Sequence, residues 1–343
     1  MRNSKEQLPW TVKAMPAIIG ILLTVGLYML VAESHNIETF EAPLTNDSRS
    51  ILDREPIQPI ESPHGLDEAK VSLGKSLFYD PRLSTDNSVS CASCHVLESG
   101  GSDGLSHSTG ALGRKTTYNS LTVLNAALNS KLTWLGKYGS LYQQTEELIV
   151  NKNTLGSNWK QLEEKLSADQ LLNEQFIATY KSGVSKTNIV DALVQYEKSL
   201  CLSNSRFDEF LKGKTNAISK EELEGYKLFK LYGCASCHQG VNVGGNMFMK
   251  FGIFDDYFKN DAPANLGRFQ LTKNEADRYV FRVPSLRNAE LTAPYFHDGS
   301  ASSLDDAVAV MAKYQLGREL PAADQRKIVA FLKTLTGVPK HEK

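Results

Sequence analysis

Two identical pentapeptides carry the residues in this sequence that are best suited to chemistry. They read Cys91-Ala-Ser-Cys94-His95 and Cys234-Ala-Ser-Cys237-His238. On one helical turn, cysteines at positions i and i+3 and a histidine at i+4 project from the same face. Two thiols on that face can bond a porphyrin while the imidazole reaches its iron from the same side. This spacing is the attachment motif of c-type haem, so the sequence predicts two covalently bound haem c groups.

Two other interpretations of these cysteines are weaker. A zinc site of four thiolates would leave His95 and His238 without a role. Structural disulfides suit an exported protein, but the two-residue spacing is more typical of redox or metal chemistry. The remaining cysteine, Cys201, lies in an apolar helical pattern and is interpreted as a small buried hydrophobe.

Length and charge limit the remaining possibilities. The 343 residues suggest two domains, each long enough to bury a core of its own. The 38 basic side chains nearly balance the 39 acidic ones, so the composition gives no support for a nucleic-acid partner.

The N-terminal region predicts a membrane anchor. Residues 14–32 carry no charged side chain, and as a helix they would span about 28 Å, close to the thickness of a bilayer core. Basic residues before this segment place residues 1–13 in the cytoplasm as a short N-terminus. We therefore expect inner-membrane anchoring with the rest of the chain in the periplasm. The alternative is a cleaved signal peptide, which would leave a periplasmic protein.

Beyond the anchor, the sequence predicts a tether and two related units. Residues 33–63 are polar and proline-rich, as expected of a tether. Gly74-Lys-Ser-Leu-Phe78 precedes the first CASCH and Gly225-Tyr-Lys-Leu-Phe229 precedes the second, an internal repeat that suggests two similar units. The short polar segment from Leu211 to Lys220 predicts a boundary between domains 64–213 and 214–343.

The predicted fold is mainly α-helical, because strand-like alternation is almost absent. Helices are expected at 67–78, 122–129, 143–149, 159–166, 168–181 and 186–202, with further helices beginning after the caps Ser219 and Ser303. On the last of these, Met311 shares a face with Ala307, Val308 and Tyr314. From this pattern alone, such a methionine is more typical of a core than of a ligand.

Several longer stretches resemble a known family. They are Leu73–Phe78, Asp80–Ser84, the two CASCH motifs, Gly100-Gly101, Asp103-Gly104, Thr122–Asn125, Asn204–Asp208, Gly244-Gly245, Lys250–Gly252, Glu275–Asn288 and Leu291–Ser300. Together these stretches resemble the bacterial di-haem cytochrome c peroxidases and their relatives in the MauG group, over about Pro56 to Gly337. The resemblance implies two cytochrome c-like domains with one haem in each.

The resemblance also implies roles for individual residues. The C-terminal haem would accept electrons and be ligated by His238 and Met311, whereas MauG has a tyrosine at the second position. Trp134 matches the tryptophan between the haems. Asn119, with the carbonyls of Thr292 and Pro294, matches a calcium site at the domain interface.

Other implied features concern the site's surroundings and the assembly. His297 matches a histidine near the haems and is expected to orient its neighbours. A homodimer is expected because family members are often dimeric.

The N-terminal haem, bound through Cys91, Cys94 and His95, would reduce peroxide, but the sequence departs from the family here. Thr154 stands where the family has a catalytic glutamate, although Gln144 matches a neighbouring site position. A hydroxyl cannot act as a general base near neutral pH. The distal histidine of many members falls at Ala111. The iron face is therefore open, or His107 four residues earlier replaces the missing ligand.

The leading hypothesis is a di-haem cytochrome c peroxidase. Electrons from a small c-type cytochrome or related donor would enter at the C-terminal haem, pass Trp134 and reduce hydrogen peroxide at the N-terminal haem. One alternative is a non-peroxidatic di-haem cytochrome for electron transfer or redox sensing, which Thr154 favours. Another is a MauG-like oxidase of a protein substrate, against which Met311 argues.

Overall fold

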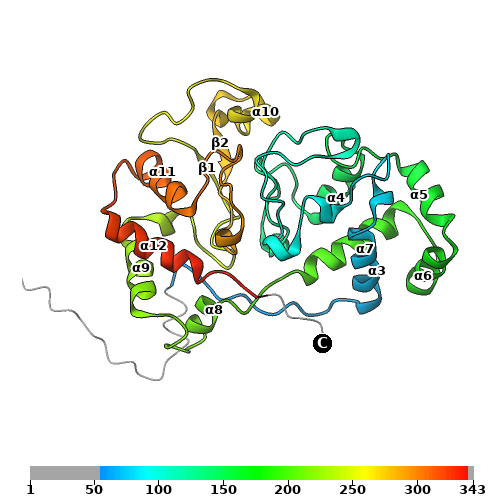
Figure 1. Ribbon diagram of the computed structural model, residues 1–343, viewed down its shortest axis with the longest axis horizontal. Helices are drawn as coiled ribbons and strands as arrows, with labels where there is room; N and C mark the ends of the chain where they lie inside the picture. The colour runs from blue at the N-terminus through cyan, green and yellow to red at the C-terminus, as the bar shows by residue number, and fades with distance from the viewer. Residues whose placement is uncertain (1–54, 339–343) are drawn as a thin grey trace, which may run out of the picture. The chain divides into compact units, whose positions relative to one another are not determined.

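Helices joined by long loops make up most of the regular structure in residues 55–338, the part of the chain that the computed structural model describes (Figure 1). The α-helices are α3 (Glu68–Phe78), α4 (Leu141–Val150), α5 (Trp159–Ser167), α6 (Gln170–Tyr180), α7 (Lys186–Ser199), α8 (Arg206–Leu211), α9 (Lys220–Leu231), α10 (Phe269–Thr272), α11 (Leu304–Leu316) and α12 (Ala322–Lys333). Single 3₁₀ turns are η1 (Pro81–Leu83), η2 (Cys91–Ser93), η3 (Leu97–Ser99), η4 (Ala111–Gly113), η5 (Ala126–Leu128), η6 (Cys234–Ser236), η7 (Pro263–Leu266), η8 (Glu275–Asp277) and η9 (Ala289–Leu291). The prediction of a mainly helical fold is confirmed.

One short antiparallel pair of strands interrupts this helical pattern in the described residues. Strands β1 (Phe248–Lys250) and β2 (Val280–Arg282) pair with Met249 opposite Phe281. The backbone N–H of Arg282 also donates to the Trp134 carbonyl at 2.8 Å. The strand pair therefore ties the loop that carries Trp134 to the C-terminal half of the chain.

Polar caps define where the helices begin. Ser219 accepts a hydrogen bond from the backbone of Glu222, whose side chain bonds back to the Ser219 N–H, which completes a capping box before α9. Ser303 accepts from the backbone N–H of Asp306 before α11. Both caps predicted from the sequence are confirmed.

Two helix crossings repeat the same close contact (Figure 1). Where α3 crosses α7, a Cβ atom on Gly74 would lie 1.9 Å from the Ala192 carbonyl oxygen. Where α9 crosses α12, a Cβ on Gly225 would lie 1.9 Å from the Lys327 carbonyl oxygen. Only glycine allows backbones to approach this closely. The repeated glycines in the sequence therefore mark two equivalent helix pairs.

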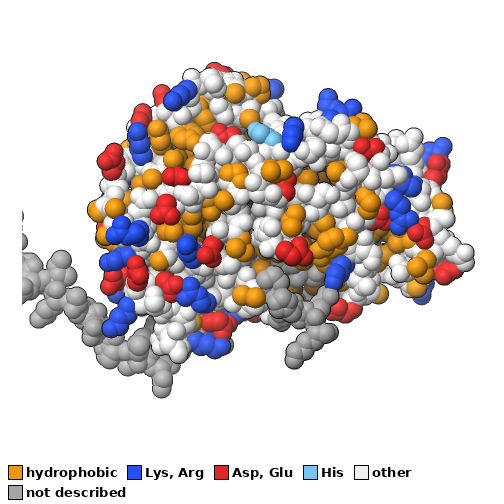
Figure 2. Space-filling view, in the orientation of Figure 1, with side chains coloured by type: hydrophobic (Ala, Val, Ile, Leu, Met, Phe, Trp, Pro, Cys, Tyr) orange, Lys and Arg blue, Asp and Glu red, His pale blue; other side chains and the backbone are white. Residues whose placement is uncertain are grey.

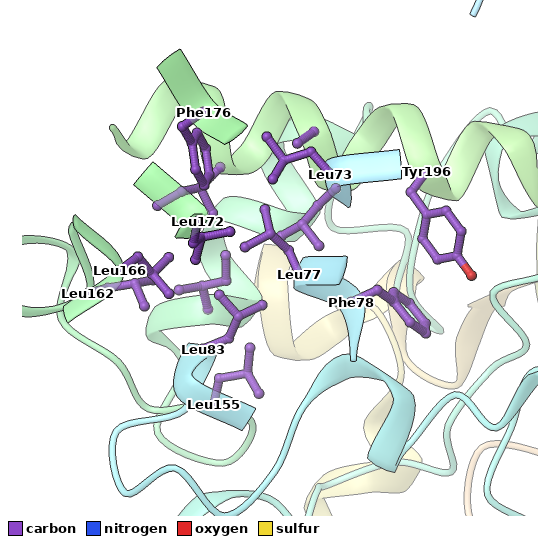
Figure 3. Packing of buried hydrophobic residues seen from close by; sticks show 14 of the residues in the cluster. Leu73, Leu77, Phe78, Leu83, Leu155, Leu162, Leu166, Leu172, Phe176 and Tyr196 are labelled. Carbon is purple, nitrogen blue, oxygen red and sulfur yellow. The ribbon is translucent and has the colours of Figure 1, made fainter. Parts of the chain in front are cut away.

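The first hydrophobic core lies around the α3–α7 crossing. Figure 3 shows leucines from α3, α5 and α6 packed with Leu83 and Leu155. Leu155 is buried, and its carbonyl accepts a hydrogen bond from Thr85 N at 2.9 Å. This anchors the loop after α4, which contains Thr154.

The second core lies around the α9–α12 crossing and includes residues from outside the predicted C-terminal domain. Phe207 and Leu211 of α8 are buried in it, as is Ile57. The Ile57 side chain is fully buried, so the end of the predicted 33–63 tether packs against the C-terminal core. The division at residue 213 stays a prediction, and this packing favours a boundary just before α8.

The helix expected at 122–129 does not form. Only the single turn η5 is helical there, because Asn125 adopts a left-handed conformation with φ of 59°. The Asn125 side chain accepts a hydrogen bond from Leu202 N at 2.6 Å. A contact with a distant segment therefore overrides the local helical pattern.

Residues 55–338 contain no helix that is both long and apolar enough to cross a membrane. The predicted anchor at 14–32 and the cytoplasmic segment 1–13 lie outside the described residues. On the face shown in Figure 2, basic and acidic side chains are interspersed.

Candidate functional site

Each CASCH motif forms one tight turn that brings its three reactive residues together. In the first, the His95 N–H donates to the Cys91 carbonyl at 3.0 Å, and in the second the His238 N–H donates to the Cys234 carbonyl at 3.0 Å. The turns η2 and η6 are 3₁₀ helices rather than the α-helical turns assumed from the sequence. All four cysteines are free thiols, so no disulfide competes with thioether attachment.

Burial favours the neutral forms of these cysteine and histidine side chains. It raises the pKa of all four thiols, that of Cys234 to about 11. It lowers the pKa of His95, and it lowers the pKa of His238 to about 4. Both imidazoles are therefore uncharged at neutral pH, which is the form that binds a metal.

The loop after the first CASCH holds His95 in one orientation. Its Nδ1 lies 3.2 Å from the Gly101 carbonyl oxygen, which leaves Nε2 as the nitrogen free to bind iron. Gly101 has φ of 77°, and a Cβ there would lie 2.7 Å from Thr122 Oγ1. The Gly100-Gly101 pair thus allows the loop to reach the imidazole.

The second CASCH opens into an apolar cavity of about 230 Å³. Cys234, Cys237, His238 and Met311 all line it. The His238 Nδ1 makes no well-formed hydrogen bond among the described residues, although nearby backbone carbonyls oppose the effect of burial on its pKa. A neutral histidine, a thioether and two thiols around an apolar space are the donor set that a haem c requires. The residues fit the group.

Residues from the N-terminal half reach the same cavity. Trp134 and Asn119 line it together with Thr292, Pro294 and His297. The Trp134 indole N–H donates to the Asn119 carbonyl at 2.8 Å, and the Asn119 N–H donates to the His297 carbonyl at 2.8 Å. The structure therefore brings together on one cavity the tryptophan expected between the haems, the three residues expected at a calcium site and the histidine expected near the haems.

His297 is held inside an aromatic box. Its side chain is only 2% exposed, and its ring centroid lies 4.6 Å from that of Phe281 and 6.4 Å from that of Trp134. Its Nε2 contacts Asn265 Oδ1 at 3.0 Å. Burial lowers its pKa, so a neutral imidazole lies edge-on to the tryptophan ring.

Thr154 and Ala111, two positions at which the sequence departs from the family pattern, lie side by side. The Ala111 N–H donates to the Thr154 carbonyl at 2.7 Å, while the Thr154 hydroxyl bonds to the Leu148 and Asn151 carbonyls of its own loop. The Thr154 proton is thus engaged within the loop. Gln144 lies on α4, and its buried Oε1 has no partner among the described residues.

His107 is half-buried in the loop between η3 and η4. Its Nδ1 lies 3.1 Å from the Thr116 carbonyl oxygen, and its charge would lower the pKa of His297. It therefore lies near the interface between the two halves. Its role as a replacement ligand stays a prediction.

Comparison with known proteins places this geometry in a family. Residues 68–216 match the family model described as di-haem cytochrome c peroxidase. Cytochrome c peroxidase Ccp of Escherichia coli (strain K12) is 42% identical over 296 residues, which cover 86% of this chain and 64% of that protein. Cytochrome c551 peroxidase of Nitrosomonas europaea is 44% identical over 286 residues, covering 82% of this chain and 84% of that protein. The chain belongs to the di-haem cytochrome c peroxidase family.

A solved structure supports the same assignment. The crystal structure of a MauG-like protein associated with microbial copper homeostasis aligns with a TM-score of 0.72 at 27% identity, covering 82% of this chain and 93% of that one. The predictions of the family and of the enzyme class are therefore confirmed. Membership of this family implies two haem c groups. The predicted calcium site, membrane anchor and homodimer are not supported by these comparisons.

One acidic residue with a shifted pKa, Glu197, is not among the residues predicted from the sequence. Glu197 lies on α7, and Thr145 of α4 donates to its carboxylate at 3.4 Å. Burial raises its pKa to about 7. The signal was present, since Glu197 continues the helical face of Val190 and Val194, both of which are buried.

Proposed function

We propose that this chain reduces hydrogen peroxide to water with electrons from a small c-type cytochrome. The observation that carries the proposal is the repeated unit, in which each glycine-mediated helix crossing has its own CASCH turn. The names of the relatives from E. coli and N. europaea support the reaction. The chain spans 64% of the length of the first of these and 84% of the second.

The two units would each hold one haem c. The first binds it through Cys91, Cys94 and His95, and the second through Cys234, Cys237 and His238. When bound, these groups supply the one-electron redox chemistry that protein side chains lack. The first unit, predicted as 64–213, would be peroxidatic, and the second, predicted as 214–343, would accept electrons. Packing of α8 supports moving the boundary to just before Ser205.

Met311 would complete the donor set of the C-terminal unit. We expect Met311→Ala to abolish the long-wavelength absorption band of methionine bound to ferric haem, because a thioether and an imidazole would then no longer both reach the iron. Met249 lines the same cavity and serves as the control. Optical spectra of the two oxidised variants test this assignment. A band lost in Met249→Ala but kept in Met311→Ala would identify Met249 as the ligand.

Trp134 and His297 would set the path of electrons between the two units. The indole is fixed by Asn119 and faced by the His297 ring. Asn119, Thr292 and Pro294 would bind calcium through oxygen atoms, the donors that this ion prefers. Their common position on one cavity supports this assignment.

The N-terminal unit would bind peroxide at a site with weak proton transfer. Ala111 provides no imidazole, so the iron face would be open. We expect Thr154→Glu to raise the peroxidase rate at least about tenfold, because a positioned acid–base group contributes roughly 10²–10⁴ in rate. Steady-state kinetics with Thr154→Gln as the uncharged control test this prediction. An equal rise in the glutamine variant would show that loss of the Thr154 loop bonds, rather than the carboxylate, is responsible.

The chain would act in the periplasm. An anchor at 14–32 would hold it at the inner membrane, and cleavage of that segment would release it. A homodimer is proposed on family resemblance. The haem-attachment chemistry and the export signal in the sequence agree with this location.

Thr154 also favours a second candidate function, a di-haem cytochrome for electron transfer or redox sensing. Without a carboxylate at this position, peroxide would bind but react slowly. A MauG-like oxidase of a protein substrate is less consistent with Met311 at the cavity.

The test is peroxide-dependent oxidation of a reduced c-type cytochrome by the purified protein. We expect turnover that requires both haem units, so that His95→Gly and His238→Gly each remove it. A haem count of two per chain is the control for loading. Absence of turnover in the loaded wild-type protein would favour the electron-transfer alternative.

A further inference from the structure

Two buried asparagines occupy equivalent places in the two units. Asn125 precedes η5 and Asn288 precedes η9, and both have a left-handed backbone, with φ of 59° and 61°. Both side chains are buried. Asparagine is one of the few residues that adopts this conformation readily. The internal repeat of the chain therefore includes a matched pair of asparagines as well as the helix crossings and the CASCH turns.

Each of these asparagines holds the chain that follows the last helix of its unit. It does so with two hydrogen bonds, one donated by its backbone N–H and one accepted by its side-chain oxygen. In the first unit, after α7, the partners are the Leu200 carbonyl at 3.1 Å and the Leu202 N–H at 2.6 Å. In the second unit, after α12, they are the Leu335 carbonyl at 3.3 Å and the Gly337 N–H at 2.9 Å.

The two segments held in this way lie against each other. A Cβ atom on Gly337 would lie 2.6 Å from Leu202 Cβ, so a larger residue than glycine would force the segments apart. Next to this contact, the Asn204 side chain donates to the Val338 carbonyl at 2.8 Å and accepts from the Val338 N–H at 3.0 Å. We call these two segments the inter-unit seam, residues 200–204 and 335–338.

A third buried asparagine joins the two units directly. Asn242 follows the second CASCH, and its Nδ2 donates to Asn129 Oδ1 at 2.8 Å and to the Asn125 carbonyl at 3.3 Å. Its own carbonyl accepts from Ser285 Oγ at 2.7 Å. Its Oδ1 has no partner among the described residues. Buried hydrogen bonds of this kind favour one arrangement of the segments they join, so Asn242 fixes the loop after the second CASCH to the first unit.

These contacts connect to the loops around His95 and His238. In the first unit, the Val123 N–H donates to the Gly101 carbonyl at 3.1 Å, and the same carbonyl lies 3.2 Å from His95 Nδ1. In the second unit, the Leu286 N–H donates to the carbonyl of the residue after Asn242 at 3.2 Å, and Leu286 lines the cavity of His238. In each unit, this N–H precedes the left-handed asparagine by two residues. A short run of backbone therefore joins the seam to each haem-attachment site.

The seam complements a separate link between the units at the cavity. There the Arg282 N–H donates to the Trp134 carbonyl and the Asn119 N–H donates to the His297 carbonyl, both at 2.8 Å. In Figure 1 the segment between α7 and α8 runs through the lower part of the molecule, away from β1 and β2 at the top. Two bodies joined along one edge can pivot about it, and a second link at another place removes that freedom.

Electron transfer becomes rapidly slower as the distance between two haems increases, and the fold sets this distance. We propose that Asn125, Asn242 and Asn288 are positioning residues that fix the two haem units relative to each other and so keep electron transfer between the haems fast. The step is the transfer of one electron, which oxidises one haem and reduces the other, with no bond made or broken. This role deepens the proposed function and rests on it for the presence of two haems.

The test measures the movement of one electron between the haems of the full-length, haem-loaded protein. A flash-generated viologen radical reduces the oxidised protein by one electron, and rapid absorption spectroscopy follows how that electron redistributes between the haems. Asn242→Ala removes both bonds to the first unit, and Gly337→Ala pushes the seam apart at a separate place. Both variants should redistribute the electron several-fold more slowly than the wild type. The absorption spectrum and the midpoint potential of each haem should stay unchanged.

Thr336→Val is the matched control. Thr336 also lies in the seam, but its Oγ1 bonds at 3.0 Å to Glu290 of the same unit. This variant should transfer the electron at the wild-type rate. If Asn242→Ala does not fold, Gly337→Ala decides the test.

Three results would overturn the proposal. They are unchanged transfer in the folded seam variants, equal slowing in Thr336→Val, and slowing that appears only together with a shifted midpoint potential. The last result would mean that the residue acts on a haem rather than on the spacing of the units. If the seam variants slow the transfer but the wild type consumes no peroxide, the proposed function fails while the role of the seam stands.

Discussion

Replacing Arg287 with methionine is expected to lower the free energy of unfolding by about 3–5 kcal/mol, the cost of leaving one partner of a buried ion pair unpaired. Arg287 Nη1 lies 2.9 Å from Asp208 Oδ1, and both side chains are fully buried. Arg287 also donates to the Gln58 and Val241 carbonyls at 3.0 and 3.1 Å. The substitution therefore removes the link between α8, the segment after residue 55 and the C-terminal unit. Urea unfolding measures the loss.

The control for this prediction is Arg206→Met on the same helix as Asp208. Arg206 pairs with Glu222 at 2.6 Å, but 52% of its side chain is exposed. Exposed pairs contribute only about 0–1 kcal/mol. Equal losses in the two variants would contradict the structural role given to the buried pair.

Replacing Gly225 with alanine is expected to disrupt the C-terminal unit, with a loss of about 3 kcal/mol or more. Overpacking typically costs roughly 1–3 kcal/mol, and here the added Cβ would meet backbone, 1.9 Å from the Lys327 carbonyl oxygen. Backbone cannot rotate away as a side chain can, so α9 and α12 must separate. Thermal unfolding followed by circular dichroism measures the effect.

Lys227→Ala is the matched control, since Lys227 is an exposed residue of the same helix. It should change stability by no more than about 0.5 kcal/mol. Normal stability of Gly225→Ala would mean that the α9–α12 crossing is wider than the structure shows. It would also weaken the equivalence with Gly74 at the α3–α7 crossing.

Local patterns predicted most of the helices and both haem-attachment motifs. The caps Ser219 and Ser303 are recognisable because the capping interaction lies within three residues. The CASCH turns are likewise local. The expected helix at 122–129 fails because Asn125 bonds to Leu202, a contact that no short window of sequence contains.

Long-range packing explains the other differences. Ile57 and Phe207 look like parts of a tether and of the first unit, yet both are buried in the second core. The contacts of His297 with Asn265 and Trp134 join three separated loops. Only the family resemblance predicts a site role for Met311, because its helical pattern alone is more typical of a core residue than of a ligand. The three-dimensional arrangement places it on the same cavity as His238.

The most direct test of the peroxidase mechanism is a single-turnover reaction. The fully reduced, haem-loaded protein is mixed with one equivalent of hydrogen peroxide, and both haems are followed by rapid-scan absorption. The mechanism predicts that both haems are oxidised as one peroxide is consumed, because its reduction to water takes two electrons. Peroxide that survives while both haems stay reduced, or that disappears without oxidation of the C-terminal haem, would contradict the proposed electron route.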